Sequence, residues 1–152
     1  MHDLPRKLTV DALAALFAGR TRFVERLAAR DDPLGAAGAL LASLPESEQL
    51  EALNAHPRIG AAGVPAVSAR EQGGESDPAV LGELARLNRL YEEKFGFRFV
   101  VFVNRRPRSE ILRVLQARIA RTREEELRTG LDALVSIALD RYGSQTRHSR
   151  AR

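Results

Sequence analysis

The sequence predicts an all-α fold, a single-domain bundle of several helices, and three observations support this prediction. Apolar residues recur at helical spacing along most of the 152 residues. Glycine and proline are concentrated between His56 and Pro78, which predicts one long loop. A single apolar, β-branched run, residues 97–103, has no second run with which it could pair as a strand. We therefore expect helices, one long loop and one buried extended segment.

Four helices are expected before His56. Thr9 is a plausible N-cap of the first, and Thr, Ser, Asp and Asn are preferred at this position. Pro33 follows two aspartates and interrupts the second helical pattern, while Pro45 suits the first position of the fourth helix. The apolar positions of these helices are Val10, Leu13, Leu16 and Phe17, then Phe23, Val24 and Leu27, then Leu40, Leu41 and Leu44, then Leu50 and Leu53.

Three more helices are expected after the loop. Asp77 and Pro78 read as the N-cap and first turn of a strong helix that Gly96 ends. Thr122 and Glu125 match a capping box for the last helix. The apolar positions of the last two helices are Ile111, Leu112, Leu115 and Ile119, then Leu127, Leu131, Leu134 and Ile137, with an end near Gly143. We expect residues 1–143 to form the domain and residues 144–152 a disordered basic tail.

Composition narrows the class of protein. Hydrophobic residues make up 44% and charged residues 29%, as in globular proteins that fold in water. The absence of cysteine excludes disulfides, thiol nucleophiles and zinc sites built on sulfur. No apolar run reaches the roughly 20 residues that cross a bilayer, and the N-terminus lacks a secretory pattern. We expect a cytoplasmic protein with no membrane association.

The net charge of +4 suggests nucleic-acid binding as an alternative function. However, the arginines are spread among glutamates and no nucleic-acid motif is present. Aromatic residues make up only 5%, which leaves little material for base stacking. We expect no nucleic-acid partner, although a small basic helical module that binds nucleic acid or protein remains the alternative of a different class.

His56 is the mid-chain histidine, and histidine is the side chain whose ordinary pKa suits acid–base chemistry near neutral pH. It lies where a helix ends and the glycine-rich loop begins, a place typical of functional residues. A helix C-terminus favours the protonated imidazole, so an acid or an anion-binding group is expected. The simpler interpretation is that His56 only caps the helix.

The loop and the extended run carry further candidates. Ser68 and Glu71 have the spacing of a capping box, but a helix N-terminus also presents N–H groups to an anion. Gln72 adds an amide that both donates and accepts hydrogen bonds. Residues 99–103 are most simply core, or they offer backbone groups to a planar ligand. Arg105, Arg106 and Arg108 form a solvated turn, or an anion anchor.

Four motifs in order make the sequence similar to a known family. They are His56-Pro57-Arg58-Ile59-Gly60, Ser68-x-x-Glu71-Gln72, Asn88-x-x-Tyr91-x-x-Lys94-Phe95-Gly96-Phe97-x-Phe99-Val100, and Ser109-Glu110-Ile111-Leu112. Together they resemble the 2-oxo-4-hydroxy-4-carboxy-5-ureidoimidazoline (OHCU) decarboxylases over nearly the whole chain. The resemblance implies an all-helical homodimer that converts a small anionic substrate to S-allantoin and carbon dioxide in urate breakdown.

The resemblance also implies roles for individual residues. His56 would be the catalytic acid or base, with Glu71 as its partner. The substrate-binding residues would be Pro57, Ser68, Gln72, Phe99, Val100, Val101, Phe102 and Val103. No cofactor and no metal would be needed, because the C=N bond of the substrate ring accepts the electron pair that decarboxylation releases. A related enzyme acting on another ureido compound is the second alternative.

Overall fold

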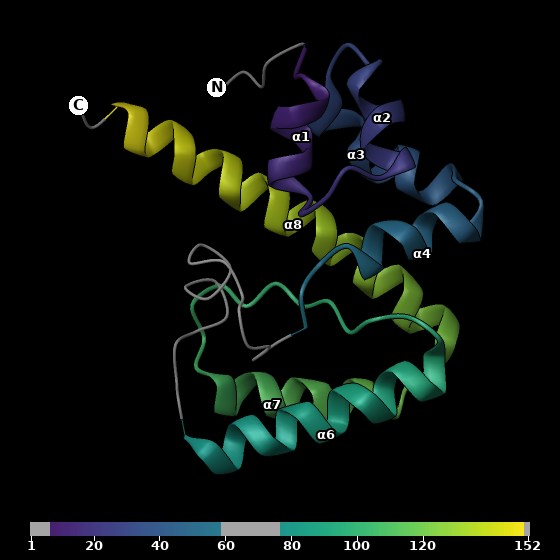
Figure 1. The fold of residues 1–152 in the computed structure, drawn as a ribbon, viewed down its shortest axis with the longest axis vertical. Coiled ribbons are helices and arrows are strands. Elements are labelled where there is room, and N and C mark those ends of the chain that lie inside the picture. The colour runs from purple at the N-terminus through teal and green to yellow at the C-terminus, as the bar shows by residue number, and fades with distance from the viewer. Residues whose placement is uncertain (1–6, 59–76, 151–152) are drawn as a thin grey trace. The chain divides into compact units, whose positions relative to one another are not determined.

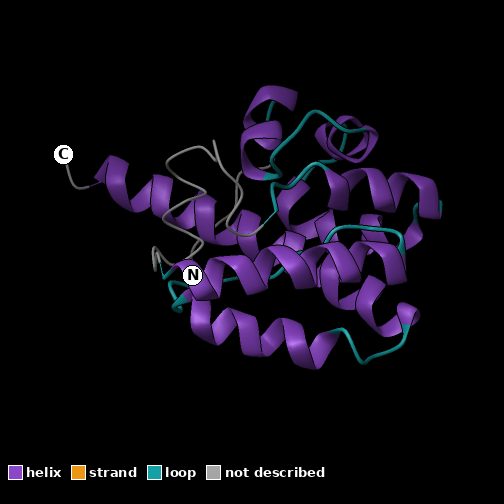
Figure 2. Cartoon of the chain, turned by 60° about the horizontal axis from the view of Figure 1, so that its bottom comes forward, coloured by secondary structure: helices purple, strands orange, loops and turns teal. Residues whose placement is uncertain are grey.

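The computed structural model describes residues 7–58 and 77–150, and within these ranges it contains seven helices and no strand (Figures 1 and 2). The helices are α1 (Val10–Leu16), α2 (Arg22–Ala28), α3 (Pro33–Ser43), α4 (Glu46–Asn54), α6 (Pro78–Phe95), α7 (Arg108–Arg118) and α8 (Arg123–Arg150). The predicted all-α class is confirmed. Among the residues described, none of the helices has the length and apolar character needed to cross a membrane.

The chain divides into two compact units. The first comprises Met1–His56 together with Leu131–Arg152, and the second comprises Pro57–Gly130. Helix α8 begins in the second unit and continues into the first. The prediction of one domain over residues 1–143 stays a prediction.

In the first unit, α2 packs against α1, α3 and α4. The predicted cap of α1 is confirmed, because the Thr9 hydroxyl accepts a hydrogen bond from the Ala12 amide at 3.0 Å. Pro45 was predicted to be the first residue of α4, but it is the N-cap, so the helix begins one residue later than predicted. Most of the predicted apolar positions form the core, with buried side chains that include Leu13, Leu16, Phe17, Phe23, Val24, Leu27, Leu40, Leu41 and Leu53. Val10, Leu44 and Leu50 are only half-buried.

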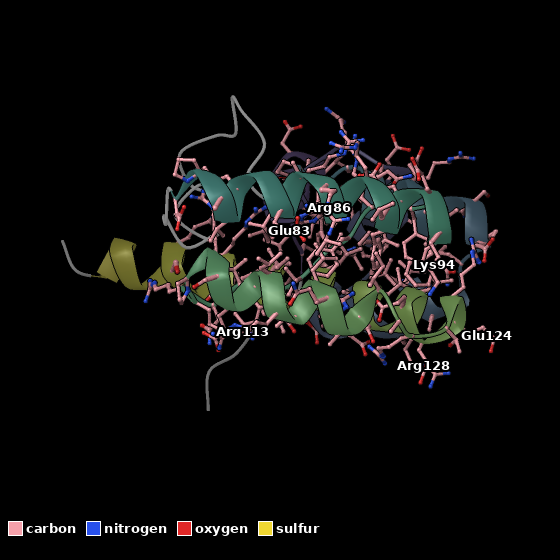
Figure 3. The ribbon with its side chains drawn as sticks, turned by 90° about the horizontal axis from the view of Figure 1, so that it is seen from below. Glu83, Arg86, Lys94, Arg113, Glu124 and Arg128 are labelled. Atoms are coloured by element: carbon pink, nitrogen blue, oxygen red, sulfur yellow. The ribbon has the colours of Figure 1, made fainter. Side chains whose placement is uncertain are left out.

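In the second unit, α6 and α7 pack side by side, and Glu83 and Arg86 lie along α6 (Figure 3). Gly96 ends α6 in the left-handed conformation with φ of 83°, as predicted from the preference for glycine at this position. Residues 98–103 follow as an extended segment without strand pairing, and most of its side chains are buried. The predicted buried extended segment is therefore confirmed.

The end of α8 differs from the prediction. The capping box at its start is confirmed, since the Thr122 and Glu125 side chains each bond the amide of the other residue at 3.0 and 3.1 Å. The helix, however, continues through Gly143 to Arg150, over residues that were assigned to a disordered tail. One glycine inside a helix costs only about 1 kcal/mol relative to alanine, which is too little to end a long helix by itself.

Candidate functional site

His56 follows the last turn of α4 in the first unit. Its backbone amide donates to the Leu53 carbonyl at 3.2 Å, so its backbone does cap the helix. Its side chain does not belong to a solvated cap, because His56 is only 5% exposed. Capping therefore explains the backbone of His56 and leaves the burial of its imidazole to be explained.

The protonation state of His56 differs from the expectation. Burial, together with the smaller effect of the nearby positive charge of Arg141, lowers the pKa of His56 to about 3. The C-terminus of a helix typically stabilises an imidazolium by about 1 kcal/mol or less. This gain is smaller than the free energy that desolvation of a buried cation costs. The predicted protonated imidazole is wrong, and His56 is neutral at physiological pH.

The motifs and candidate residues of the sequence do not include Arg141. It is buried on α8, and its Nη1 donates to the carbonyl oxygens of Ala15 and Leu16 at 3.3 and 3.2 Å. The end of α1 thus helps to hold a positive charge near His56. A sequence signal existed: Arg141 lies seven residues after Leu134 and three after Ala138, on the buried stripe of the helix.

The residues after His56 belong to the second unit. Pro57 is half-buried, and Arg58 makes two hydrogen bonds to the Glu92 carboxylate on α6, at 2.6 and 2.9 Å. This bidentate geometry is the strong form of an arginine–carboxylate pair. The arginine of the first motif thus has a definite partner, which ties the chain after Pro57 to α6.

Three of the predicted site residues, Ser68, Glu71 and Gln72, lie outside the described residues. The capping-box and anion-binding interpretations of that segment stay predictions.

The extended segment at residues 99–103 lies in the second unit, and arginines bind several of its carbonyl oxygens. Arg118 Nη1 donates to the Val100 carbonyl at 3.0 Å. Arg106 donates to the carbonyls of Phe102 and Val103 at 2.8 and 3.0 Å. A ligand of this segment would therefore find these three carbonyls already engaged, and we expect it to use other backbone groups.

The turn that carries the basic cluster fits the solvated-turn interpretation at its first two residues, while the anion anchor stays a prediction. Asn104 and Arg105 adopt positive φ values of 51° and 63° and are exposed, as expected of a solvated turn. Arg106 instead folds back onto the extended segment through the two bonds just described. The described residues contain no group of three or more His, Asp or Glu side chains placed to hold a metal ion.

The described part of the chain is all-helical, and it buries a histidine, His56, with a pKa far below its ordinary value near the buried Arg141. Residues 2–143 match the model of the OHCU decarboxylase family, so the chain belongs to this family. The resemblance stated from the four motifs is confirmed.

Several named proteins are similar to parts of the chain. A uric acid degradation bifunctional protein of Bacillus sp. (strain TB-90) is 30% identical over 63% of this chain and 20% of its own length. The bifunctional protein TTL of Arabidopsis thaliana is 37% identical over 47% of this chain and 25% of its own. The 2-oxo-4-hydroxy-4-carboxy-5-ureidoimidazoline decarboxylase of Haloferax volcanii is 32% identical over 60% of this chain and 57% of its own length. The matched region thus spans a fifth to somewhat over half of these relatives.

Solved structures share the fold. A crystal structure of OHCU decarboxylase in the presence of (S)-allantoin superposes with a TM-score of 0.74, over 88% of this chain and 96% of that one, at 24% identity. A crystal structure of (S)-allantoin synthase superposes with a TM-score of 0.67 at 22% identity. These likenesses establish the helical architecture of the chain.

Proposed function

We propose that the chain decarboxylates 2-oxo-4-hydroxy-4-carboxy-5-ureidoimidazoline to S-allantoin, without a cofactor. The family match supports the reaction, and the single observation that carries the proposal is the buried, neutral His56 beside the positive charge of Arg141. A neutral histidine can accept a proton, and an arginine attracts an anionic substrate.

The reaction needs only acid–base groups and correct orientation. The bond between the carboxylate and its ring carbon breaks, carbon dioxide leaves, and the electron pair moves into the adjacent C=N bond, whose nitrogen takes a proton. The resulting enol then loses its hydroxyl proton to become a carbonyl, while the carbon that bears the ureido group gains a proton. That last proton must arrive on one face, because the product is chiral.

His56 acts in this scheme as the base for the substrate hydroxyl. Its low pKa keeps it neutral and able to accept a proton, but it makes His56 a weak base in the free protein. An anionic substrate nearby favours the imidazolium and raises the pKa of His56 in the complex. Glu71, the partner implied by the resemblance, would have the same effect and help to place the proton.

Arg141 supplies the positive charge of the site. Its guanidinium is held by the end of α1 and is buried, so little solvent screens its attraction for a carboxylate. The remaining contacts are those implied by the family: Pro57, Ser68, Gln72 and residues 99–103 would orient the ring and its ureido group. Orientation of this kind contributes much of the rate in reactions without a cofactor.

Nucleic-acid binding is less well supported. Several arginines bond carboxylates and so present little unneutralised charge; they are Arg20, Arg26, Arg58, Arg86, Arg118 and Arg121. A nucleic-acid binder would show an affinity that falls steeply with salt, so a DNA titration at two salt concentrations tests this alternative.

The homodimer and the cytoplasmic location belong to the same proposal and come from the resemblance and the sequence. Sedimentation equilibrium would test the first, and cell fractionation the second.

The reaction itself is tested by product analysis. Urate, uricase and hydroxyisourate hydrolase generate the short-lived substrate in place, and carbon-13 NMR follows the products with and without this protein. We expect faster loss of the intermediate and accumulation of the S enantiomer of allantoin. An unchanged decay with racemic product would contradict the proposal, and a new product would indicate a related ureido substrate.

A further inference from the structure

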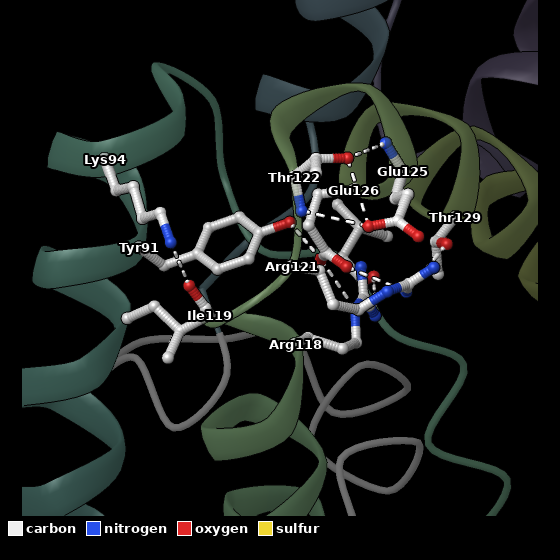
Figure 4. A network of polar contacts seen from close by, with 10 residues as sticks. Tyr91, Lys94, Arg118, Ile119, Arg121, Thr122, Glu125, Glu126 and Thr129 are labelled. Atoms are coloured by element: carbon white, nitrogen blue, oxygen red, sulfur yellow. Dashed lines mark hydrogen bonds and ion pairs between the residues drawn. The ribbon is translucent and has the colours of Figure 1, made fainter.

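Arg118 connects three parts of the second unit although it lies on the buried side of α7. Its Nε donates to Glu126 Oε1 at 2.8 Å (Figure 4). Its Nη1 donates to the Val100 carbonyl at 3.0 Å. Its guanidinium carbon lies 4.6 Å from the centroid of the Phe99 ring, within cation–π range. One side chain thus joins α7 and α8 to two adjacent residues of the extended segment.

The carboxylate that orients Arg118 is itself fixed. Glu126 is fully buried, the Tyr91 hydroxyl donates to its Oε1 at 2.6 Å, and Arg121 Nη1 donates to its Oε2 at 2.9 Å (Figure 4). Burial and the hydrogen bond to Glu126 raise the pKa of the Tyr91 phenol, which therefore remains a donor. Helices α6 and α8 together set the place of Arg118.

Stability alone does not explain this arginine. Replacing a buried ion pair by well-packed apolar residues is often neutral or stabilising, because two charges no longer need to be desolvated. Moreover, Nη2 of Arg118 is buried and has no hydrogen-bond partner in the described part of the chain, which adds a further cost. An apolar side chain would fill the space, but it could not donate to the Val100 carbonyl.

We propose that Arg118 is a positioning residue that fixes the backbone at Phe99 and Val100 in the conformation that binds the substrate. This inference rests on the proposed function, in which residues 99–103 contact the substrate. Arg118 itself need not touch the substrate, since it acts through the segment that it holds.

Arg121 offers a matched control. It bonds the same carboxylate through Oε2, but its Nη1 also donates to the Thr129 hydroxyl on α8 at 3.1 Å. A change at Arg121 therefore weakens the anchor of Glu126 without releasing the carbonyl of Val100. If Arg118 had a purely structural role, variants of Arg118 and Arg121 with equal free energies of unfolding would have the same KM and the same hydrogen exchange.

The test compares Arg118→Lys with Arg121→Lys in the full chain. Lysine keeps the charge beside Glu126, but it lacks the planar fork that reaches two acceptors at once. For Arg118→Lys we expect KM for the urate-derived intermediate to rise about tenfold with kcat nearly unchanged, the effect of losing one charge-assisted hydrogen bond in ground-state binding. Amide hydrogen exchange in a peptide covering residues 97–103 should quicken by a similar factor. Arg121→Lys should change neither quantity.

Two results would overturn the inference: a wild-type KM with unchanged exchange in Arg118→Lys, or equal effects of both variants. If the wild-type protein does not turn over the intermediate, the proposed function fails, while the exchange measurement still decides whether Arg118 fixes the segment. If Arg118→Lys does not fold, the double variant Arg118→Gln with Glu126→Gln removes both charges. It should then show the same rise in KM and the same faster exchange.

Discussion

Arg58 pairs with Glu92 through two short hydrogen bonds, Nε to Oε2 at 2.6 Å and Nη2 to Oε1 at 2.9 Å. Arg58 is two residues after His56, and Glu92 lies near the end of α6. The side chains of Arg58 and Glu92 are 49% and 24% exposed, so the pair contributes little to global stability. Its effect is local, because it fixes the chain directly after Pro57.

This relationship predicts the behaviour of three variants. Arg58→Ala and Glu92→Ala should each lower kcat/KM by a similar factor of about three to ten, and the double variant should be no worse than either. The free energy of unfolding should change by about 1 kcal/mol or less in each case. Steady-state kinetics and urea denaturation measure the two quantities.

The Glu83–Arg86 pair on the same helix provides the control, and Arg86→Ala should leave kcat/KM unchanged (Figure 3). A large loss in Arg58→Ala with none in Glu92→Ala would contradict the account. It would assign Arg58 to the substrate itself and not to the tether.

The burial of His56 predicts a pH dependence of stability. The pKa of His56 is about 3 in the folded protein against an ordinary value of 6.5, so the unfolded chain binds more protons between these values. Stability is therefore lost as pH falls below 6.5, by about 2 kcal/mol between pH 6.5 and 5. Urea denaturation at several pH values should show this slope in the wild-type protein and a shallower one in His56→Gln.

Gln49→Leu serves as the comparison for that experiment, because Gln49 is a buried polar residue on α4 that does not titrate. It should be less stable than wild type but keep the wild-type slope. Equal slopes in all three proteins would show that the pKa of His56 is the same in the folded and unfolded states. That result would contradict the inference that burial lowers the pKa of His56.

Two glycines near α6 predict stability changes of opposite sign. Gly96 has φ of +83°, and Gly82 lies inside the helix; an added Cβ would meet nothing within 4 Å at either position. Gly96→Ala should destabilise by about 1 kcal/mol, because alanine disfavours the left-handed region. Gly82→Ala should stabilise by about 0.5–1 kcal/mol through helix propensity. If the denaturation midpoints of both variants shifted in the same direction relative to wild type, the result would argue against the end of α6 at Gly96.

Tyr91→Phe removes one donor from the fully buried Glu126 carboxylate while leaving both arginines in place. We expect a loss of about 1–3 kcal/mol in the free energy of unfolding, typical of a hydrogen bond to a charged group. Thermal unfolding monitored by far-ultraviolet circular dichroism would measure it, and a wild-type melting curve would be inconsistent with the network in Figure 4.

The features that sequence predicted well are those governed by neighbouring residues. The Thr9 cap, the end of α6 at Gly96 and the capping box at Thr122 each depend on backbone groups within about one turn. The run after Gly96 was recognisable as extended from its short, apolar, β-branched sequence. Because the sequence offers no second strand to pair with it, it was predicted to be a buried segment outside any sheet.

The features that sequence missed depend on tertiary packing. The charge of Arg141 acts on His56 across 85 positions of the chain. Arg118 occupies a buried position of α7, where the apolar pattern had indicated Ile119. Both arginines fall on buried helical stripes, so an arginine at a core position was the available signal. The neutral state of His56 could not be read from the sequence, because desolvation depends on the packed environment.

The central claim is that His56 performs acid–base chemistry on the urate-derived intermediate. The most direct test follows the circular dichroism of that intermediate, generated in place by uricase and hydroxyisourate hydrolase, with wild type, His56→Ala and Gln49→Leu. We expect rapid decay to S-allantoin with wild type and Gln49→Leu, and the uncatalysed rate with His56→Ala. Full activity of His56→Ala would contradict the account.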